Sequence, residues 1–284
     1  MSVLTIGGDM RYAYLTALAA SRPMEIAAVG LERAPMQLPS AALDDIPQAH
    51  AVILPNPWRS GTVLPLSAHS FTTEDVISRL NPGTLLLLSD TSGMPDELRS
   101  AFSCVDLSAC ADSLLKNAHL TAEAALFSAM RDSDRALGDS MCLIIGYGRI
   151  ARRLAYLLKS MGAQTAVAVR REEARLQAQA DGISAFLMED LPILLPRAHF
   201  IFSTPPAQVL TGPLLSRIQP DALLMDLASP PFGFSLDLAR SLGLHASRES
   251  GLPGRCCPLS AARILLDSVV EALDNHPKGG SSCL

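Results

Sequence analysis

Short apolar runs alternate along the chain with segments whose apolar residues recur at helical spacing. The run Met141–Ile145 is unbroken and apolar, as in a parallel strand that is covered on both faces. Glycines follow it, and residues 150–161 then have the spacing of an amphipathic helix. The same succession of strand, turn and helix recurs on both sides of this run, which predicts parallel sheets with helices on their faces. Strands are predicted at Val3–Ile6, Glu25–Val29, Ala51–Leu54, Thr84–Leu88, Met141–Ile145, Gln164–Val169, Ala198–Phe202, Ala222–Asp226 and Leu244–Ala246.

Gly146, Gly148 and Ala151 form the pattern G-x-G-x-x-A directly after the predicted strand. In a dinucleotide-binding fold, the first glycine permits the tight turn, the second lets the backbone approach a pyrophosphate, and the third small residue lets the helix pack on the strand. The free N–H groups of the helix N-terminus favour the phosphates. The pattern therefore predicts a dinucleotide site, with contacts from Gly146, Tyr147, Gly148, Arg149 and Ile150.

The end of the next predicted strand distinguishes the possible dinucleotides. A site for NAD usually has an acidic residue there, which accepts hydrogen bonds from the ribose hydroxyls. This chain has Arg170 and Arg171 instead, and two guanidinium groups suit a 2'-phosphate. They could also be a solvated helix N-terminus, although positive charge is unfavourable there. We therefore predict NADP in preference to NAD. Residues that follow two later predicted strands should also contact the cofactor. They are Thr204, Pro205, Asp226, Ala228 and Ser229.

A long helix predicted at Thr121–Leu137 separates two such series of strands. We expect an α/β protein of two doubly wound Rossmann-like domains with parallel sheets and an interdomain cleft. Residues 1–118 are expected to form the substrate or catalytic domain, and residues 119–258 the NADP-binding domain, which begins with a bridging helix at 119–137. A C-terminal helix at 259–275 is expected to return to the first domain, and residues 276–284 to form a flexible tail.

Composition limits the classes of partner. The net charge of −5 argues against a protein that neutralises nucleic-acid phosphates. The apolar runs are too short for a membrane span, and the start lacks the pattern of a signal peptide, so a cytoplasmic protein is expected. Six cysteines without C-x-x-C spacing and six histidines without H-x-x-x-H spacing predict reduced thiols and no metal site.

Several strings, in order along nearly the whole chain, resemble the A subunit of bacterial dipicolinate synthase. They are Ile6-Gly7-Gly8-Asp9-Met10-Arg11, Asn117 with Thr121-Ala122-Glu123, Gly146-Tyr147-Gly148-Arg149, Leu210 to Leu215, Asp226-Leu227-Ala228-Ser229-Pro230 and Gly251-Leu252-Pro253-Gly254. The resemblance implies an NADP-dependent oxidoreductase that forms pyridine-2,6-dicarboxylate from a dihydrodipicolinate-type precursor of the lysine pathway during sporulation. It also implies a flavoprotein-like second subunit. The chain departs from the family at Pro230–Gly233 and Cys257–Ser260, where two basic residues are missing.

Oxidation of a dihydropyridine dicarboxylate requires a hydride acceptor, a base, and groups that hold two carboxylates. Asp9 or Glu123 is the predicted base, although each could instead cap a helix. Arg11 and Arg59 are candidate carboxylate clamps, although Arg11 could instead form an ion pair with a neighbouring acid. Thr121 could donate a hydroxyl hydrogen bond.

Other functions with the same topology stay open. A 2-hydroxy-acid or shikimate-type dehydrogenase is one alternative, and a non-catalytic NADP-binding regulatory protein is another. The chain could also form a homo-oligomer. A substrate panel distinguishes the first alternative, and binding without turnover distinguishes the second.

Overall fold

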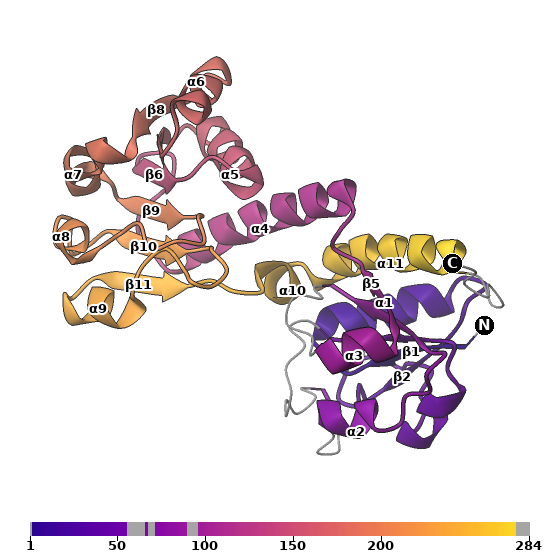
Figure 1. Cartoon of the computed structure of the whole chain (residues 1–284). Helices are drawn as coiled ribbons and strands as arrows, with labels where there is room; N and C mark the ends of the chain where they lie inside the picture. The colour runs from indigo at the N-terminus through magenta and orange to yellow at the C-terminus, as the bar shows by residue number, and fades with distance from the viewer. Residues whose placement is uncertain (1, 56–65, 68–71, 90–95, 277–284) are drawn as a thin grey trace. The chain divides into compact units, whose positions relative to one another are not determined.

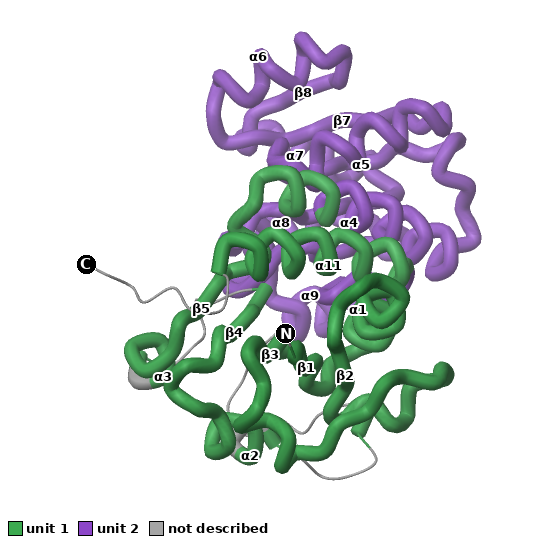
Figure 2. Tube along the Cα trace, turned by 90° about the vertical axis from the view of Figure 1, so that its right-hand side faces the viewer, with its two compact units in different colours: residues 1–117, 257–284 green, residues 118–256 purple. Residues whose placement is uncertain are grey.

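The computed structural model describes residues 2–55, 66–67, 72–89 and 96–276, and these form two compact units. Unit 1 consists of Met1–Asn117 with Cys257–Leu284, and unit 2 consists of Ala118–Cys256 (Figure 2). The predicted tail at 276–284 lies outside the described residues from 277 onward.

Unit 1 contains a five-stranded parallel sheet with the order β2-β1-β3-β4-β5. Figure 1 draws the strands of this unit in indigo to magenta. This order is that of flavodoxin-like sheets. The strands are β1 (Ser2–Ile6), β2 (Glu25–Val29), β3 (Ala51–Ile53), β4 (Leu85–Leu88) and β5 (Ser103–Asp106). The helices are α1 (Met10–Ala20), α2 (Thr73–Ile77), α3 (Asp96–Ala101) and α11 (Pro258–Asn275), and a short 3-10 helix, η1, spans Leu43–Gln48.

Alternate strand residues of unit 1 pack against different helices. Val3, Ile53 and Leu87 point to the face that α1 and α11 cover, where Leu15 and Leu266 are fully buried. Leu4, Val52 and Leu86 point to the opposite face and pack with residues such as Ile46 and Val76. Because both faces are covered, the strands are apolar without polar alternation, as in parallel sheets generally. The C-terminal helix is thus part of the core of unit 1, although it is far from α1 in the sequence.

Unit 2 contains a six-stranded parallel sheet with the order β11-β10-β9-β6-β7-β8. This is the Rossmann order, in which two half-sheets diverge from neighbouring central strands, here β6 and β9. The strands are β6 (Met141–Ile145), β7 (Gln164–Val169), β8 (Ser184–Leu187), β9 (Phe200–Ser203), β10 (Leu223–Asp226) and β11 (His245–Arg248). The helices are α5 (Arg149–Ser160), α6 (Glu172–Ala180), α7 (Leu191–Leu194), α8 (Gly212–Leu215), α9 (Leu236–Ser241) and α10 (Leu252–Cys256), with the short 3-10 helices η2 (Met188–Asp190) and η3 (Leu195–Arg197). The predicted class of two parallel-sheet α/β domains is confirmed.

The prediction for the long helix was wrong at both ends, because α4 spans Ala111–Arg131 rather than Thr121–Leu137. Its C-terminal end coincides with a polar stretch that begins at Asp132, whose carboxylate accepts two hydrogen bonds from Arg131. Asp and Ser side chains compete with helical hydrogen bonds, so they favour ending the helix there. Among the described residues, no helix combines the length and hydropathy needed to cross a membrane.

Candidate functional site

The glycine turn of unit 2 lies between β6 and α5, at the point where the strand order of the sheet reverses. Gly146 has a φ of +92°, which is in the region that favours glycine. A Cβ atom on Gly146 would lie 2.6 Å from Thr204 Oγ1, so the turn also needs glycine for space. The Thr204 hydroxyl itself donates to the carbonyl of Ile145 at 2.8 Å, and this bond ties the loop after β9 to the end of β6.

Gly148 differs from Gly146 in its surroundings. Its backbone is extended, and a Cβ atom there would meet nothing within 4 Å. Gly148 is also the N-cap of α5, where no side chain caps the helix. Arg149 is exposed and Ile150 is half-buried, so the first turn of α5 presents free backbone N–H groups beside open space. This arrangement fits a dinucleotide pyrophosphate, which requires close backbone approach and a helix N-terminus.

Tyr147 stands between the two glycines, but its side chain is engaged elsewhere. Its hydroxyl donates to the Asp181 carboxylate at 2.8 Å, and the Arg152 guanidinium lies 5.3 Å from its ring centroid. Burial, together with the hydrogen bond to Asp181, raises the pKa of Tyr147 to about 12. The side chain of Tyr147 is thus engaged within the protein, which leaves its backbone for the predicted cofactor contact.

The loop after β10 is held by a buried carboxylate. Asp226 is fully buried, and it accepts hydrogen bonds from the backbone N–H groups of Ala228 at 3.1 Å and Gly233 at 3.0 Å. Burial raises the pKa of Asp226, and these hydrogen bonds offset part of the rise. Ala228 is buried, whereas Ser229 is exposed. The Asp226 side chain thus holds the backbone of the loop after β10 through hydrogen bonds. Of Asp226, Ala228 and Ser229, only Ser229 is exposed and accessible to a ligand.

Arg248, at the end of β11, is a loop-supporting residue that was not predicted from the sequence. Its guanidinium lies 3.6 Å from the ring centroid of Phe232 and donates to the carbonyl of Phe234 at 3.2 Å. Its Nε atom lies 3.9 Å from the Asp226 carboxylate. Phe232 has a φ of +67°, which a bulky residue rarely adopts, so the loop depends on these contacts. The only signal in the sequence was a basic residue at a strand end.

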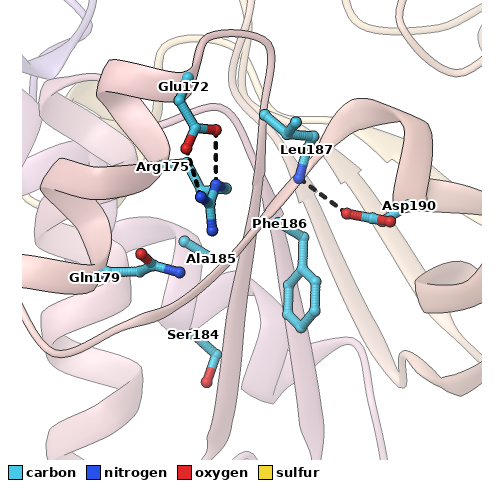
Figure 3. A pocket seen from close by; sticks show the side chains of 8 residues that line it. All are labelled: Glu172, Arg175, Gln179, Ser184, Ala185, Phe186, Leu187 and Asp190. Atoms are coloured by element: carbon cyan, nitrogen blue, oxygen red, sulfur yellow. Dashed lines mark hydrogen bonds and ion pairs between the residues drawn. The ribbon is translucent and has the colours of Figure 1, made fainter.

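Arg170 and Arg171 lie directly after β7, and both are exposed. Within the described part of the chain, neither guanidinium has a hydrogen-bond or ion-pair partner. Glu172 is the nearest following carboxylate, but it is paired with Arg175, whose Nε donates to it at 2.8 Å. That hydrogen bond lowers the pKa of Glu172. The pair lines a pocket of about 480 Å³ between α6 and β8. Figure 3 shows the contacts between Glu172 and Arg175 as dashed lines. Among the described residues, the end of β7 thus presents two cations without a partner, Arg170 and Arg171. The carboxylate that follows them, Glu172, is ionised and already paired with Arg175.

In unit 1, the turn after β1 joins two predicted site residues. Asp9 caps α1 by accepting from the backbone N–H of Arg11 at 2.9 Å. The same carboxylate accepts from Arg11 Nε at 2.9 and 3.0 Å and from Nη2 at 2.7 Å. Gly8 makes the turn possible, because a Cβ atom there would lie 2.4 Å from the Tyr12 ring. Asp9 is therefore both a helix cap and the partner of Arg11.

The other predicted catalytic residues lie on α4, in unit 2. Glu123 is exposed, and Arg153 donates to it at 3.3 Å. Thr121 is buried. Arg59, the second predicted carboxylate clamp, lies outside the described residues. Of the two candidate bases, Glu123 is the less occupied by neighbouring donors.

A Rossmann sheet with a glycine turn, joined to a second parallel sheet, is the architecture of NAD(P)-dependent dehydrogenases. The apo-structure of D-lactate dehydrogenase from Escherichia coli matches it with a TM-score of 0.60 at 11% identity, covering 97% of each chain. No family model matches the sequence.

Two further comparisons concern one particular enzyme. The chain is 24% identical over 286 residues to the A subunit of dipicolinate synthase from Bacillus subtilis (strain 168), covering 96% of each protein. The crystal structure of the A subunit of dipicolinate synthase from Bacillus halodurans matches with a TM-score of 0.84 at 24% identity, covering 95% of this chain and 97% of the other. The resemblance inferred from the sequence strings is confirmed as a similarity over nearly the whole chain.

Proposed function

We propose that the protein is an NADP-dependent oxidoreductase that acts on a cyclic dicarboxylate, in the manner of the A subunit of a dipicolinate synthase. The observation that carries the proposal is the group of features at the carboxyl edge of the second sheet. Gly148 leaves open space beside the uncapped start of α5, where Arg149 is exposed. Arg170 and Arg171 are exposed at the end of β7, the strand that pairs with β6. Together they supply backbone donors for a pyrophosphate and guanidinium groups for a 2'-phosphate.

The preference for NADP is supported by two electrostatic facts. The arginines after β7 have no partner among the described residues, so their hydrogen-bond donors are available to a phosphate. Glu172 is engaged by Arg175, so it is poorly placed to accept from the ribose hydroxyls of NAD. A site for NAD would need the opposite arrangement, with a free carboxylate and no adjacent cation.

The proposed reaction converts a dihydropyridine dicarboxylate into the aromatic pyridine dicarboxylate. When bound, the oxidised nicotinamide accepts a hydride from the substrate ring, and a proton of the ring leaves to a base. Glu123 is the candidate base that we favour, because Asp9 is fully engaged by Arg11. Arg11 is the proposed clamp for a substrate carboxylate. Thr121 and Ser229 are proposed donors to substrate or cofactor.

The partner and the setting of the reaction belong to the same proposal. Because the similar proteins are A subunits of a synthase, we propose that a second, flavoprotein-like subunit works with this chain. The remaining proposals from the resemblance are a substrate derived from the lysine pathway and a role in sporulation. A cytoplasmic location, which was expected from the sequence composition, is part of the same proposal.

The proposal is tested in two steps with the full-length protein. NADP and NAD should each be titrated into the protein and the binding measured by calorimetry. NADP should bind clearly more tightly than NAD. Turnover should then be followed through the absorbance of the reduced nicotinamide, with a dihydrodipicolinate, a panel of 2-hydroxy acids and shikimate, each with and without the second subunit. Equal binding of both dinucleotides would refute the NADP preference. Turnover of only a 2-hydroxy acid or shikimate would refute the substrate, and binding without any turnover would favour a regulatory role.

A further inference from the structure

The pocket between α6 and β8 runs along the outer edge of the sheet in unit 2. The strand residues that line it are Ser184, Ala185, Phe186 and Leu187. Because successive side chains of a strand point to opposite faces of a sheet, a pocket lined by four consecutive residues lies along the edge of the strand. β7 occupies the other edge of β8, and β8 is the last strand of the sheet. We call this pocket the β8 groove.

The backbone of β8 directs hydrogen-bonding groups into the β8 groove. The N–H of Leu187 donates to the Asp190 carboxylate at 3.1 Å, so it points away from β7. Successive N–H groups of a strand alternate in direction, so the N–H and C=O groups of Ala185 point to the same edge. Asp190 therefore occupies the edge at Leu187, and the backbone of Ala185 faces the groove.

β8 differs from the other edge strands because it lacks the usual features that prevent pairing. Such features are charged side chains, proline and covering segments. In unit 1, β2 is covered by residues 39–41, which form hydrogen bonds of 2.7 and 2.8 Å with Ala28. β5 contains Asp106, and β11 contains Arg248. The four residues of β8 include no charge and no proline, no described segment pairs with its outer edge, and Phe186 is 36% exposed.

The charged side chains of the β8 groove lie toward one end. Figure 3 shows Glu172, Arg175 and Asp190 toward that end, and Gln179 and Ser184 at the other. A second copy related by a two-fold axis through the middle of β8 would place its uncharged end beside these charges. Like charges therefore do not meet across the axis, so the groove is electrostatically complementary to itself.

We infer that the β8 groove is an interface between two copies of this chain, in which the two β8 strands pair antiparallel across a two-fold axis. In a hydrogen-bonded antiparallel pair, opposite residues exchange both N–H···O=C bonds, and Ala185 is the residue whose backbone faces the groove. Ser184 of one copy then lies opposite Phe186 of the other copy, on the same face of the sheet. The two sheets become continuous, and an isologous contact of this kind closes at a dimer. The inference goes beyond the proposed function, since it requires neither dinucleotide nor substrate.

Sedimentation velocity of the full-length protein over a range of concentrations should show a dimer. Ala185→Pro removes the N–H that faces the groove, and proline is tolerated on an edge strand where the N–H points outward. Phe186→Lys places a charge on the edge and covers the case in which Ala185→Pro does not fold. Each change occurs twice in a two-fold contact, so each should raise the dissociation constant of the dimer at least about 10-fold.

The matched control is Leu238→Lys, which should leave the dimer intact. Leu238 is 40% exposed, but it lies on α9, which packs beside β11 at the opposite edge of the sheet. A monomeric parent protein would overturn the inference. A dimer that persists undiminished in folded Ala185→Pro or Phe186→Lys would also overturn it.

Cysteine cross-linking tests the register of the two strands. Opposite residues of a non-hydrogen-bonded antiparallel pair have Cα atoms about 4.5 Å apart, which a disulfide can span. A mixture of the Ser184→Cys and Phe186→Cys proteins should therefore form a cross-linked dimer under mild oxidation, above the level of either variant alone and of the parent. Cross-linking that is no greater in the mixture than in the separate variants would contradict the proposed register. None of these measurements uses catalytic activity, so failure of the proposed function would leave their results unchanged.

Discussion

A Cβ atom on Gly146 would lie 2.6 Å from Oγ1 of Thr204, the residue whose hydroxyl ties the loop after β9 to the end of β6. Gly146→Ala should therefore destabilise unit 2 through both steric overlap and a positive φ. We expect a loss of about 2–4 kcal/mol in the free energy of unfolding. Urea denaturation followed by circular dichroism measures it. A loss below about 0.5 kcal/mol would mean that the turn relaxes easily, contrary to the tight packing described.

Gly148→Ala is the matched experiment at the other glycine. Its backbone is extended and a Cβ atom meets nothing within 4 Å, so stability should change little. The added methyl group would instead occupy the space proposed for the pyrophosphate. We expect NADP affinity to fall about 10- to 100-fold, as measured by calorimetry on a variant with parental unfolding behaviour. Unchanged affinity would argue that the dinucleotide does not approach Gly148.

The two arginines after β7 can be tested for selectivity between dinucleotides. Arg170→Ala and Arg171→Ala should each weaken NADP binding about 10- to 100-fold, because each removes charge-assisted hydrogen bonds to a phosphate. NAD binding should hardly change. Arg197→Ala is a suitable control, because Arg197 is also exposed but precedes β9, at the opposite edge of the sheet. If the affinities for NADP and NAD fell equally, the two arginines would attract anions in general and would not recognise the 2'-phosphate.

Asp226 provides a test of stability against pH. Burial raises its pKa, so the folded protein holds this proton more tightly than the unfolded chain does. The proton-linked stabilisation is therefore fully present below the unfolded pKa of about 3.9, and it is lost as the pH rises through the higher folded pKa. The non-titrating variant Asp226→Asn should lack this decline. Unfolding free energies of the parent and the variant, measured across that window, should converge or cross as the pH rises. If the parent instead gains stability relative to the variant, the backbone hydrogen bonds outweigh burial.

Local sequence patterns predicted most of the strands, but fewer of the contacts at the candidate site. Met141–Ile145 was predicted with its exact bounds, because a buried central strand is an unbroken apolar run followed by glycine. The edge strands β5 and β8 were not predicted, since both are partly exposed and lack such a run. The other two edge strands, β2 and β11, were predicted, so the missing apolar run rather than the edge position accounts for the difference.

At the candidate site, too, features formed by consecutive residues were predicted and contacts between distant residues were not. The glycine turn and the arginines after β7 were visible because their chemistry lies in consecutive residues. The support of Tyr147 by Asp181 links positions 34 apart, and no spacing rule brings such a pair together. The boundary of α4 was missed for a related reason, because Ala111–Asn117 belongs to unit 1 and has little buried surface of its own.

The thiol of Cys142 tests how rigid the strand beneath the glycine turn is. Cys142 is fully buried in β6, and burial raises its pKa to about 12. Only the thiolate reacts with alkylating reagents, so Cys142 should be protected in the native protein at about pH 8. Cys256 and Cys257 are partly exposed and serve as internal controls. Iodoacetamide labelling followed by peptide mass spectrometry should modify these residues first, and Cys142 only when urea unfolds unit 2. Labelling of Cys142 at the rate of the controls would mean that β6 opens locally, and a glycine turn on such a strand could not be preorganised for the cofactor.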